Sequence, residues 1–170
     1  DKVVLWSRRR EKALGLIASL RARDDLHQVT SWKVAADPAE AAGCDVVVTA
    51  TAATEPVLSG RWLSGASHVN AIGTDTEAVI RASTLVVETG DTLLEAGDLQ
   101  LAEDEVGGVL TRVVTLGALL DPRASSPRTG ERGAISIFKS CGVAFEDLAV
   151  AVLALRRAQE RDLGVRFAFN

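Results

Sequence analysis

The sequence has no methionine and only two cysteines in 170 residues. Cys44 and Cys141 lie too far apart for a local metal-ligand motif and are too few for a disulfide scaffold. We therefore expect no metal, and a reduced protein of the cytoplasm. Because methionine is missing even at the first position, we expect this sequence to be a fragment of a longer chain.

Long apolar runs are also missing. None approaches the roughly 20 residues of a membrane-spanning helix, and the N-terminus has no signal-peptide pattern. The net charge of −4 gives no general attraction to nucleic acid. We expect neither a membrane nor a nucleic acid as partner. At 47% apolar residues, however, the chain can form a domain that buries about 68–70% of its unfolded surface.

Short apolar runs alternate with helical patterns along the chain. Strands are predicted at 3–6, 28–32, 45–48, 67–72, 84–88 and 134–138. Helices are predicted at 10–20, 38–42, 77–82, within 90–101, at 109–120 and, largely buried, at 143–157. Residues 121–132 are rich in Pro, Ser, Gly and Arg and predict a surface loop.

This alternation predicts an α/β fold with a Rossmann-like, doubly wound parallel sheet. Residues 1–132 are expected to form a partial dinucleotide-binding domain. Residues 133–170 would supply a strand and helix that return toward a substrate and dimerisation domain. No GxGxxG motif occurs in the sequence. The sheet is therefore expected to lack its first strand and the glycine-rich loop that holds a pyrophosphate.

The segment SRRR, residues 7–10, directly follows the first predicted strand. In dinucleotide-binding domains, arginine at the tip of the second strand accommodates the 2′-phosphate of NADP, because its planar fork binds phosphate with two hydrogen bonds. A basic, solvated helix start is the simpler interpretation. Positive charge in a first helical turn opposes the helix dipole, however, and this favours the phosphate role.

Three further segments follow predicted strands, where ligands bind in doubly wound folds. The run TATAATEP, residues 49–56, is small and hydroxyl-rich, which suits the close approach of a flat ring or a plain exit loop. In GTDT, residues 73–76, Asp75 suits a catalytic acid or base, but spacing alone favours a helix cap. In FKSCG, residues 138–142, Cys141 is expected to line a pocket rather than act as a nucleophile.

Taken in order, these segments resemble the ornithine cyclodeaminase/mu-crystallin family. The resemblance rests on LWSRRREKA (5–13), CDVVVTATAATEPVLSGRWLSGASHVNAIGTD (44–75) and GAISIFKSCGVAFEDLAVA (133–151). The first of these looks like the ketimine reductase branch. The resemblance implies a homodimeric NAD(P)-dependent oxidoreductase that acts on a small amino acid or its imine, with NADP(H) favoured over NAD(H).

The same resemblance implies roles for particular residues. The positions that hold the cofactor's adenosine ribose and its phosphate in the family match Ser7, Arg8 and Arg9. The loop that passes along the cofactor matches Thr49, Ala50 and Thr51. The strand end beside the nicotinamide matches Ile72 and Gly73. Asp75 matches an acid/base aspartate near the substrate nitrogen, and Cys141 and Gly142 match a segment that lines the substrate site. The family's substrate-binding lysine and arginines have no counterpart here, and the segment after Asp75 is shorter than usual.

The leading hypothesis is NADPH-dependent reduction of a cyclic imine amino acid by the parent protein, with the fragment itself inactive. Ornithine cyclodeamination, which yields proline and ammonia, is the alternative. That branch typically carries an acidic residue at the second strand tip, where this chain has Ser7 and arginines. A non-catalytic NADPH-binding fragment, or a chain that only pairs with a partner, also remains open.

Overall fold

The structure is a computed structural model that describes residues 1–65, 67–123, 134–165 and 167. The chain divides into two compact units, residues 1–140 and residues 141–170. The expected domain boundary at 132/133 and most of the predicted loop at 121–132 fall outside the described residues. None of the described helices is long and apolar enough to cross a membrane.

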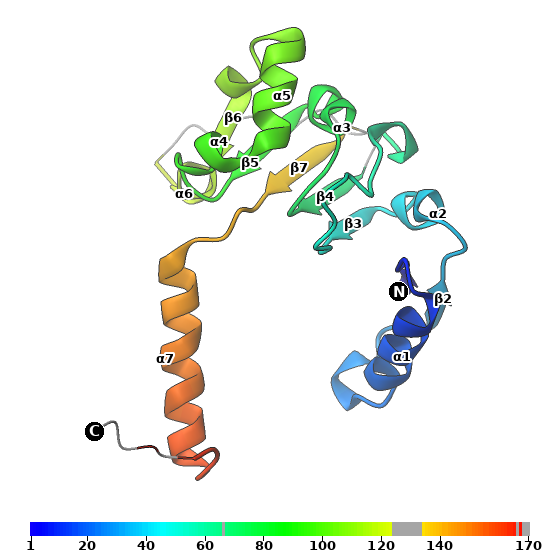
Figure 1. The fold of residues 1–170 in the computed structure, drawn as a ribbon, viewed down its shortest axis with the longest axis vertical. Coiled ribbons are helices and arrows are strands. Elements are labelled where there is room, and N and C mark those ends of the chain that lie inside the picture. Colours follow the sequence, from blue (N-terminus) through cyan, green and yellow to red (C-terminus); the bar gives the residue numbers. More distant parts are fainter. Residues whose placement is uncertain (66, 124–133, 166, 168–170) are drawn as a thin grey trace. The chain divides into compact units, whose positions relative to one another are not determined.

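The first unit consists of short strands joined by helices and loops (Figure 1). Its strands are β1 (Lys2–Leu5), β2 (Ser31–Val34), β3 (Val46–Thr49), β4 (His68–Ala71), β5 (Thr84–Val87), β6 (Val113–Thr115) and β7 (Ser136–Lys139). Its α-helices are α1 (Arg10–Arg21), α2 (Pro38–Ala42), α3 (Thr76–Arg81), α4 (Thr92–Glu95), α5 (Gly97–Val106) and α6 (Leu116–Leu120). Single 3₁₀ turns are η1 (Asp24–Leu26), η2 (Gly60–Trp62) and η3 (Leu110–Arg112).

All the described strand pairs are parallel, which confirms the predicted α/β class. One sheet holds β1 and β2, and a second sheet has the order β3-β4-β7-β5-β6. β7 lies between β4 and β5, although it comes last of these strands in the sequence. In its register, Ile137 is opposite Val69 on one side and Leu85 on the other.

The core lies between the larger sheet and the helices α3 and α5, which Figure 1 shows side by side. Val69, Leu85 and Ile137 are at most 1% exposed, and helix residues Val79 and Leu99 pack in the same cluster. Burying each such side chain stabilises the fold by about 1.5–3 kcal/mol.

Local signals set several helix starts. Asp37 caps α2 by accepting a hydrogen bond from the Glu40 backbone N–H at 2.9 Å, and Pro38 occupies the first helical position. Both features, and the bounds of this helix, agree with the sequence prediction. The helix within 90–101 is instead two helices, α4 and α5, and α5 continues to Val106.

The prediction of a helix at 109–120 is wrong. This segment forms η3, the edge strand β6 and the short helix α6. Val113, Val114 and Thr115 are β-branched, and they pair with Leu85, Val86 and Val87 of β5. Pairing on an available sheet edge outweighs the helical spacing of the apolar residues.

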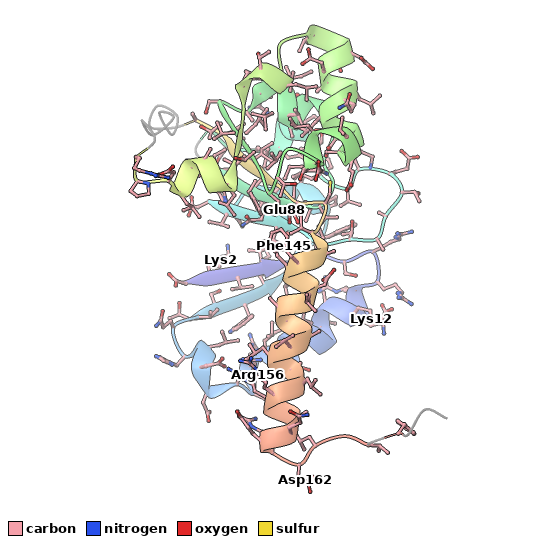
Figure 2. All side chains as sticks on the ribbon, turned by 90° about the vertical axis from the view of Figure 1, so that its left-hand side faces the viewer. Lys2, Lys12, Glu88, Phe145, Arg156 and Asp162 are labelled. Carbon is pink, nitrogen blue, oxygen red and sulfur yellow. The ribbon has the colours of Figure 1, made fainter. Side chains whose placement is uncertain are left out.

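The second unit consists mainly of α7 (Ala144–Glu160). Figure 2 shows its side chains as sticks, from Phe145 near the start to Arg156 near the end. The expectation of a largely buried helix is wrong, because α7 has no buried residue, and Phe145, Leu148 and Leu155 are each about 60% exposed. The spacing of its apolar residues predicts a helix correctly, but not how much of that helix is buried.

Gly60 offers a test of packing between η2 and α3. A Cβ at this position would lie 2.7 Å from the Ala78 Cα, a contact between two backbones that neither can easily relieve. We expect Gly60→Ala to lower the free energy of unfolding by about 1–3 kcal/mol, measured by urea denaturation. Gly15→Ala is the control, since Gly15 lies in α1 with open space around it and its replacement should stabilise by about 0.5–1 kcal/mol. An unchanged midpoint for Gly60→Ala would contradict this packing.

Candidate functional site

The carboxyl ends of β3 and β4 carry most of the predicted site residues. Thr49 is the last residue of β3, and Ala50 and Thr51 follow it as exposed loop residues. Ile72 and Gly73 follow β4 and begin the turn into α3, here called the β4–α3 turn and defined as residues 72–75. Since ligands of doubly wound folds bind at this edge, these residues are brought to the expected place.

The β4–α3 turn is held by side chains from three other elements. Thr49 Oγ1 donates a hydrogen bond to the Gly73 carbonyl at 2.9 Å. Lys139 Nζ, at the end of β7, donates to the Ile72 carbonyl. The backbone N–H of Thr74 donates to Asp98 Oδ2, in the first turn of α5, at 3.2 Å. The turn backbone is thus fixed, while Ile72 itself is 55% exposed.

Asp75 ends this turn and caps α3. Its Oδ1 accepts hydrogen bonds from the backbone N–H of Ala78 and from that of Gly60, both at 2.9 Å. The capping role favoured by spacing alone is therefore present. Among the described residues, Oδ2 receives no hydrogen bond, so the half-buried carboxylate retains one oxygen for another partner. The acid/base role stays a prediction.

The arginine segment follows β1. Arg9 is the N-cap residue of α1, in extended conformation, and its backbone N–H lies 3.4 Å from Ser7 Oγ. Arg8, Arg9 and Arg10 are exposed, and no described carboxylate forms an ion pair with their guanidinium groups. Three arginines therefore place positive charge at a helix start where the dipole is also positive, with one acidic residue, Glu11, in the first turn.

A cavity of about 690 Å³ lies between the facing strands β1 and β3. Residues 1–6 line one side and residues 45–49 the other, with Trp6 and Thr51 at the carboxyl ends. The cavity therefore lies between an edge strand of the two-stranded sheet and an edge strand of the five-stranded sheet, close to the residues after β1 and those after β3.

The remaining predicted residues, Cys141 and Gly142, begin the second unit. Both are exposed, and Gly142 has a positive φ of 83°, which favours glycine there. Their role at a substrate site stays a prediction. Across the described residues, no three His, Cys, Asp or Glu side chains lie close enough to hold a metal ion.

With this geometry in hand, comparison with known proteins identifies the family. The sequence matches the ornithine cyclodeaminase/mu-crystallin family over residues 1–162. The chain belongs to this family. The match covers both units, and it confirms the resemblance carried by the three sequence segments.

Curated relatives in the family share about a third of their residues with this chain. Ketimine reductase mu-crystallin of Rattus norvegicus is 30% identical over 160 residues, which are 89% of this chain and 46% of that protein. A Delta(1)-pyrroline-2-carboxylate reductase of Bacillus cereus (strain ATCC 14579) is 33% identical over 181 residues, 99% of this chain and 53% of that protein. The chain spans about half the length of these relatives.

Solved structures confirm the Rossmann-like fold. A probable ornithine cyclodeaminase from Bordetella pertussis Tohama I has a TM-score of 0.67 at 34% identity, over 98% of this chain and 62% of that one. Thermococcus litoralis Delta(1)-pyrroline-2-carboxylate reductase, in complex with NADH and L-proline, has a TM-score of 0.81 at 24% identity, over 98% of this chain and 53% of that one. An archaeal alanine dehydrogenase dimer with bound NAD has a TM-score of 0.75 at 25% identity, over 99% of this chain and 53% of that one.

The sequence analysis did not identify three residues that hold the β4–α3 turn or its helix in place: Lys139, Asp98 and Gly60. A lysine in the apolar strand run IFK is a usable signal, because a lysine in a covered parallel sheet must be paired. Asp98 carried no such signal, since acidic residues are common in a first helical turn. Gly60 could not be identified without knowing that η2 packs on α3.

The two hydrogen bonds to Asp75 Oδ1 predict the effect of its replacement. We expect Asp75→Ala to lower the free energy of unfolding by about 2–3 kcal/mol, because it loses a cap and leaves the buried Gly60 N–H without its acceptor. Asp75→Asn should lose less than about 1 kcal/mol, because the amide oxygen still accepts.

Asp37→Ala is the matched control, since Asp37 caps α2 with a single backbone hydrogen bond. It should cost about 1 kcal/mol in the same urea titration. Equal losses for Asp75→Ala and Asp37→Ala would contradict the second hydrogen bond at Asp75.

Proposed function

We propose that this chain is the cofactor-binding part of an NADPH-dependent oxidoreductase that reduces a cyclic imine amino acid. The observation that carries the proposal is the arginine segment after β1, where exposed arginines without described ion-pair partners follow Ser7, whose hydroxyl lies 3.4 Å from the Arg9 backbone N–H. Bidentate donors of permanent charge suit a 2′-phosphate. The names of the curated relatives, a ketimine reductase and pyrroline-2-carboxylate reductases, support the reaction class.

The residues present fit a dinucleotide at the carboxyl edge of the sheet. Ser7, Arg8 and Arg9 would hold the adenosine ribose and its phosphate, and the loop from Thr49 to Thr51 would pass along the cofactor. Apart from the chain neighbours of Gly73, no described atom lies within 4 Å of the place a Cβ would take, which leaves room for a flat ring beside that backbone. When bound, NADPH would supply the hydride for the imine carbon.

This chain's own contribution to the chemistry would centre on Asp75. Its Oδ1 is committed to two backbone N–H groups, which fixes the orientation of the carboxyl group. Oδ2 would then hold the proton at the substrate nitrogen, as a general acid during imine reduction. Cys141 and Gly142 would line the substrate site. The cationic clamp for the substrate carboxylate has no assigned residue in this chain.

Ornithine cyclodeamination is the second candidate, supported by the 34% identity to a probable ornithine cyclodeaminase. The basic residues after β1 favour NADPH and so weigh against it. We also propose that the whole protein is a homodimer of the cytoplasm. The dimeric archaeal alanine dehydrogenase of similar structure supports the assembly, and the cysteine usage supports the location.

Cofactor preference is tested by fluorescence titration with NADPH and NADH at low and high salt. We expect NADPH to bind at least about tenfold more tightly, since one charge-assisted pair contributes about 1.5–3 kcal/mol. This advantage should shrink as salt increases. The double variant Arg8→Ala/Arg9→Ala should abolish the preference and leave NADH binding nearly unchanged.

The matched control is Lys12→Ala/Arg21→Ala, which removes the same charge from exposed positions elsewhere on α1. It should keep the preference for NADPH. Tighter binding of NADH would overturn the assignment and move cyclodeamination to first place. Failure of both nucleotides to bind would show that this chain alone does not form the cofactor site.

The acid/base role is tested by Asp75→Asn in the complete protein, where turnover can be measured. The substitution keeps the cap but removes the acidic proton of the carboxyl group, so we expect a melting temperature lowered by at most a few degrees. We also expect a loss of about 10²–10⁴-fold in kcat with a pyrroline carboxylate. Unchanged kcat would confine Asp75 to its structural role.

A further inference from the structure

The ion pair between Lys139 and Asp98 lies inside the larger unit. Lys139 Nζ is 2.8 Å from Asp98 Oδ2, and the two side chains are only 6% and 9% exposed. Lys139 ends the central strand β7, and Asp98 lies in the first turn of α5. Removing two charges from water costs several kcal/mol each, so such a pair is retained only where further hydrogen bonds offset that cost.

Those further hydrogen bonds go to the β4–α3 turn. Lys139 Nζ also donates to the Ile72 carbonyl, and Asp98 Oδ2 also accepts from the Thr74 backbone N–H at 3.2 Å. The two side chains of the ion pair therefore form hydrogen bonds with the backbone on both sides of Gly73. The Gly73 carbonyl between these contacts accepts from Thr49 Oγ1. Backbone groups of Ile72, Gly73 and Thr74 are thus bonded to β7, β3 and α5 respectively.

Neighbouring contacts fasten the same edge of the sheet. The Ser140 backbone N–H donates to the Ala71 carbonyl at 2.9 Å, and Ser140 Oγ donates to Glu88 Oε1 at 2.6 Å. These bonds join the carboxyl ends of β4, β5 and β7. Lys139 and Asp98 add the connection from β7 and α5 to the turn itself.

We infer that Lys139 and Asp98 are positioning residues, which hold the β4–α3 turn so that exposed Ile72 and Gly73 face the cofactor. The cofactor half of this inference rests on the proposed function. If the pair only filled space in the core, apolar side chains of similar size could replace it, and such replacements often make a protein more stable. Here both charged groups also bond the backbone of one turn at the ligand edge, while Asp98 Oδ1 accepts from the Leu99 backbone N–H of its own helix at 3.0 Å.

The test replaces the pair with the apolar double variant Lys139→Met/Asp98→Leu. Such replacements are often neutral for stability, but here the buried Thr74 N–H loses its acceptor, so we expect a folded protein whose melting temperature is lowered by several degrees. Hydrogen exchange at the Thr74 amide should become at least about tenfold faster, because its acceptor is gone. The amide of Val69, in β4, should exchange faster only by the factor that the measured loss of stability accounts for, and less than the Thr74 amide does.

NADPH affinity is measured on the same samples. We expect the double variant to bind about tenfold more weakly, since a loosened turn must be ordered on binding. Arg112→Met is the matched control. It removes a cation that donates to the Ala82 carbonyl at 2.8 Å, at the other end of α3. This control should change neither Thr74 exchange nor NADPH affinity.

The outcomes separate the inference from the function on which it rests. Unchanged Thr74 exchange in the folded double variant overturns the positioning role. Faster exchange with unchanged NADPH affinity overturns its connection to the cofactor. If the wild-type chain binds no nucleotide, the proposed function fails for this chain, whereas Thr74 exchange still decides whether the pair holds the turn.

A second variant covers the case in which the double variant does not fold. Asp98→Asn keeps the volume of the side chain but removes its negative charge, so the hydrogen bonds that Oδ2 accepts from Lys139 and the Thr74 N–H become weaker, neutral-acceptor bonds. We expect Thr74 exchange to be several-fold faster in this variant. Wild-type exchange in Asp98→Asn would contradict the inference.

Discussion

The insertion of β7 between β4 and β5 is the constraint on which the rest of the unit depends. β7 forms hydrogen-bonded ladders with both neighbours, which are not bonded to each other. The row formed by Val69, Ile137 and Leu85 crosses the three strands and is almost fully buried. Because loop-closure entropy grows only slowly with loop length, the long connection before β7 costs little against this burial. The same insertion carries Lys139 to the turn after β4.

Local features of the fold could be predicted from the sequence, and long-range ones could not. The cap at Asp37 and the proline after it identify α2, because their effect is confined to one helical turn. By contrast, Val113–Thr115 joins the sheet because β5 presents a free edge, which no local pattern reveals. The apolar residues of α7 indicate what the helix can bury, not what covers it.

In the candidate site, too, local features could be predicted from the sequence and long-range contacts could not. Residues after the strands could be proposed from the sequence because parallel strands place their carboxyl ends together, and the family resemblance then suggested roles for them, which stay predictions. The contact between Lys139 and Asp98 joins residues 41 positions apart. It depends on β7 and α5 meeting beside β4, so it emerges only once the strand order is known. Gly60 was missed for the same reason, since its constraint is the backbone of α3.

The two interpretations of Asp75, cap and acid/base, do not compete for the same atom. The cap uses Oδ1, and the second hydrogen bond, from Gly60, also ends there. A carboxylate fixed in this way cannot rotate to satisfy other partners without losing both bonds. Fixing one oxygen therefore orients the other, at a turn that Thr49, Lys139 and Asp98 already hold in place. A helix cap at the ligand edge of a parallel sheet is thus a suitable way to present a carboxyl oxygen to a substrate. The hydrogen bonds of the cap stabilise the fold and also fix the rotation of the carboxyl group. A catalytic carboxyl group held in this way loses no further rotational freedom when the substrate binds.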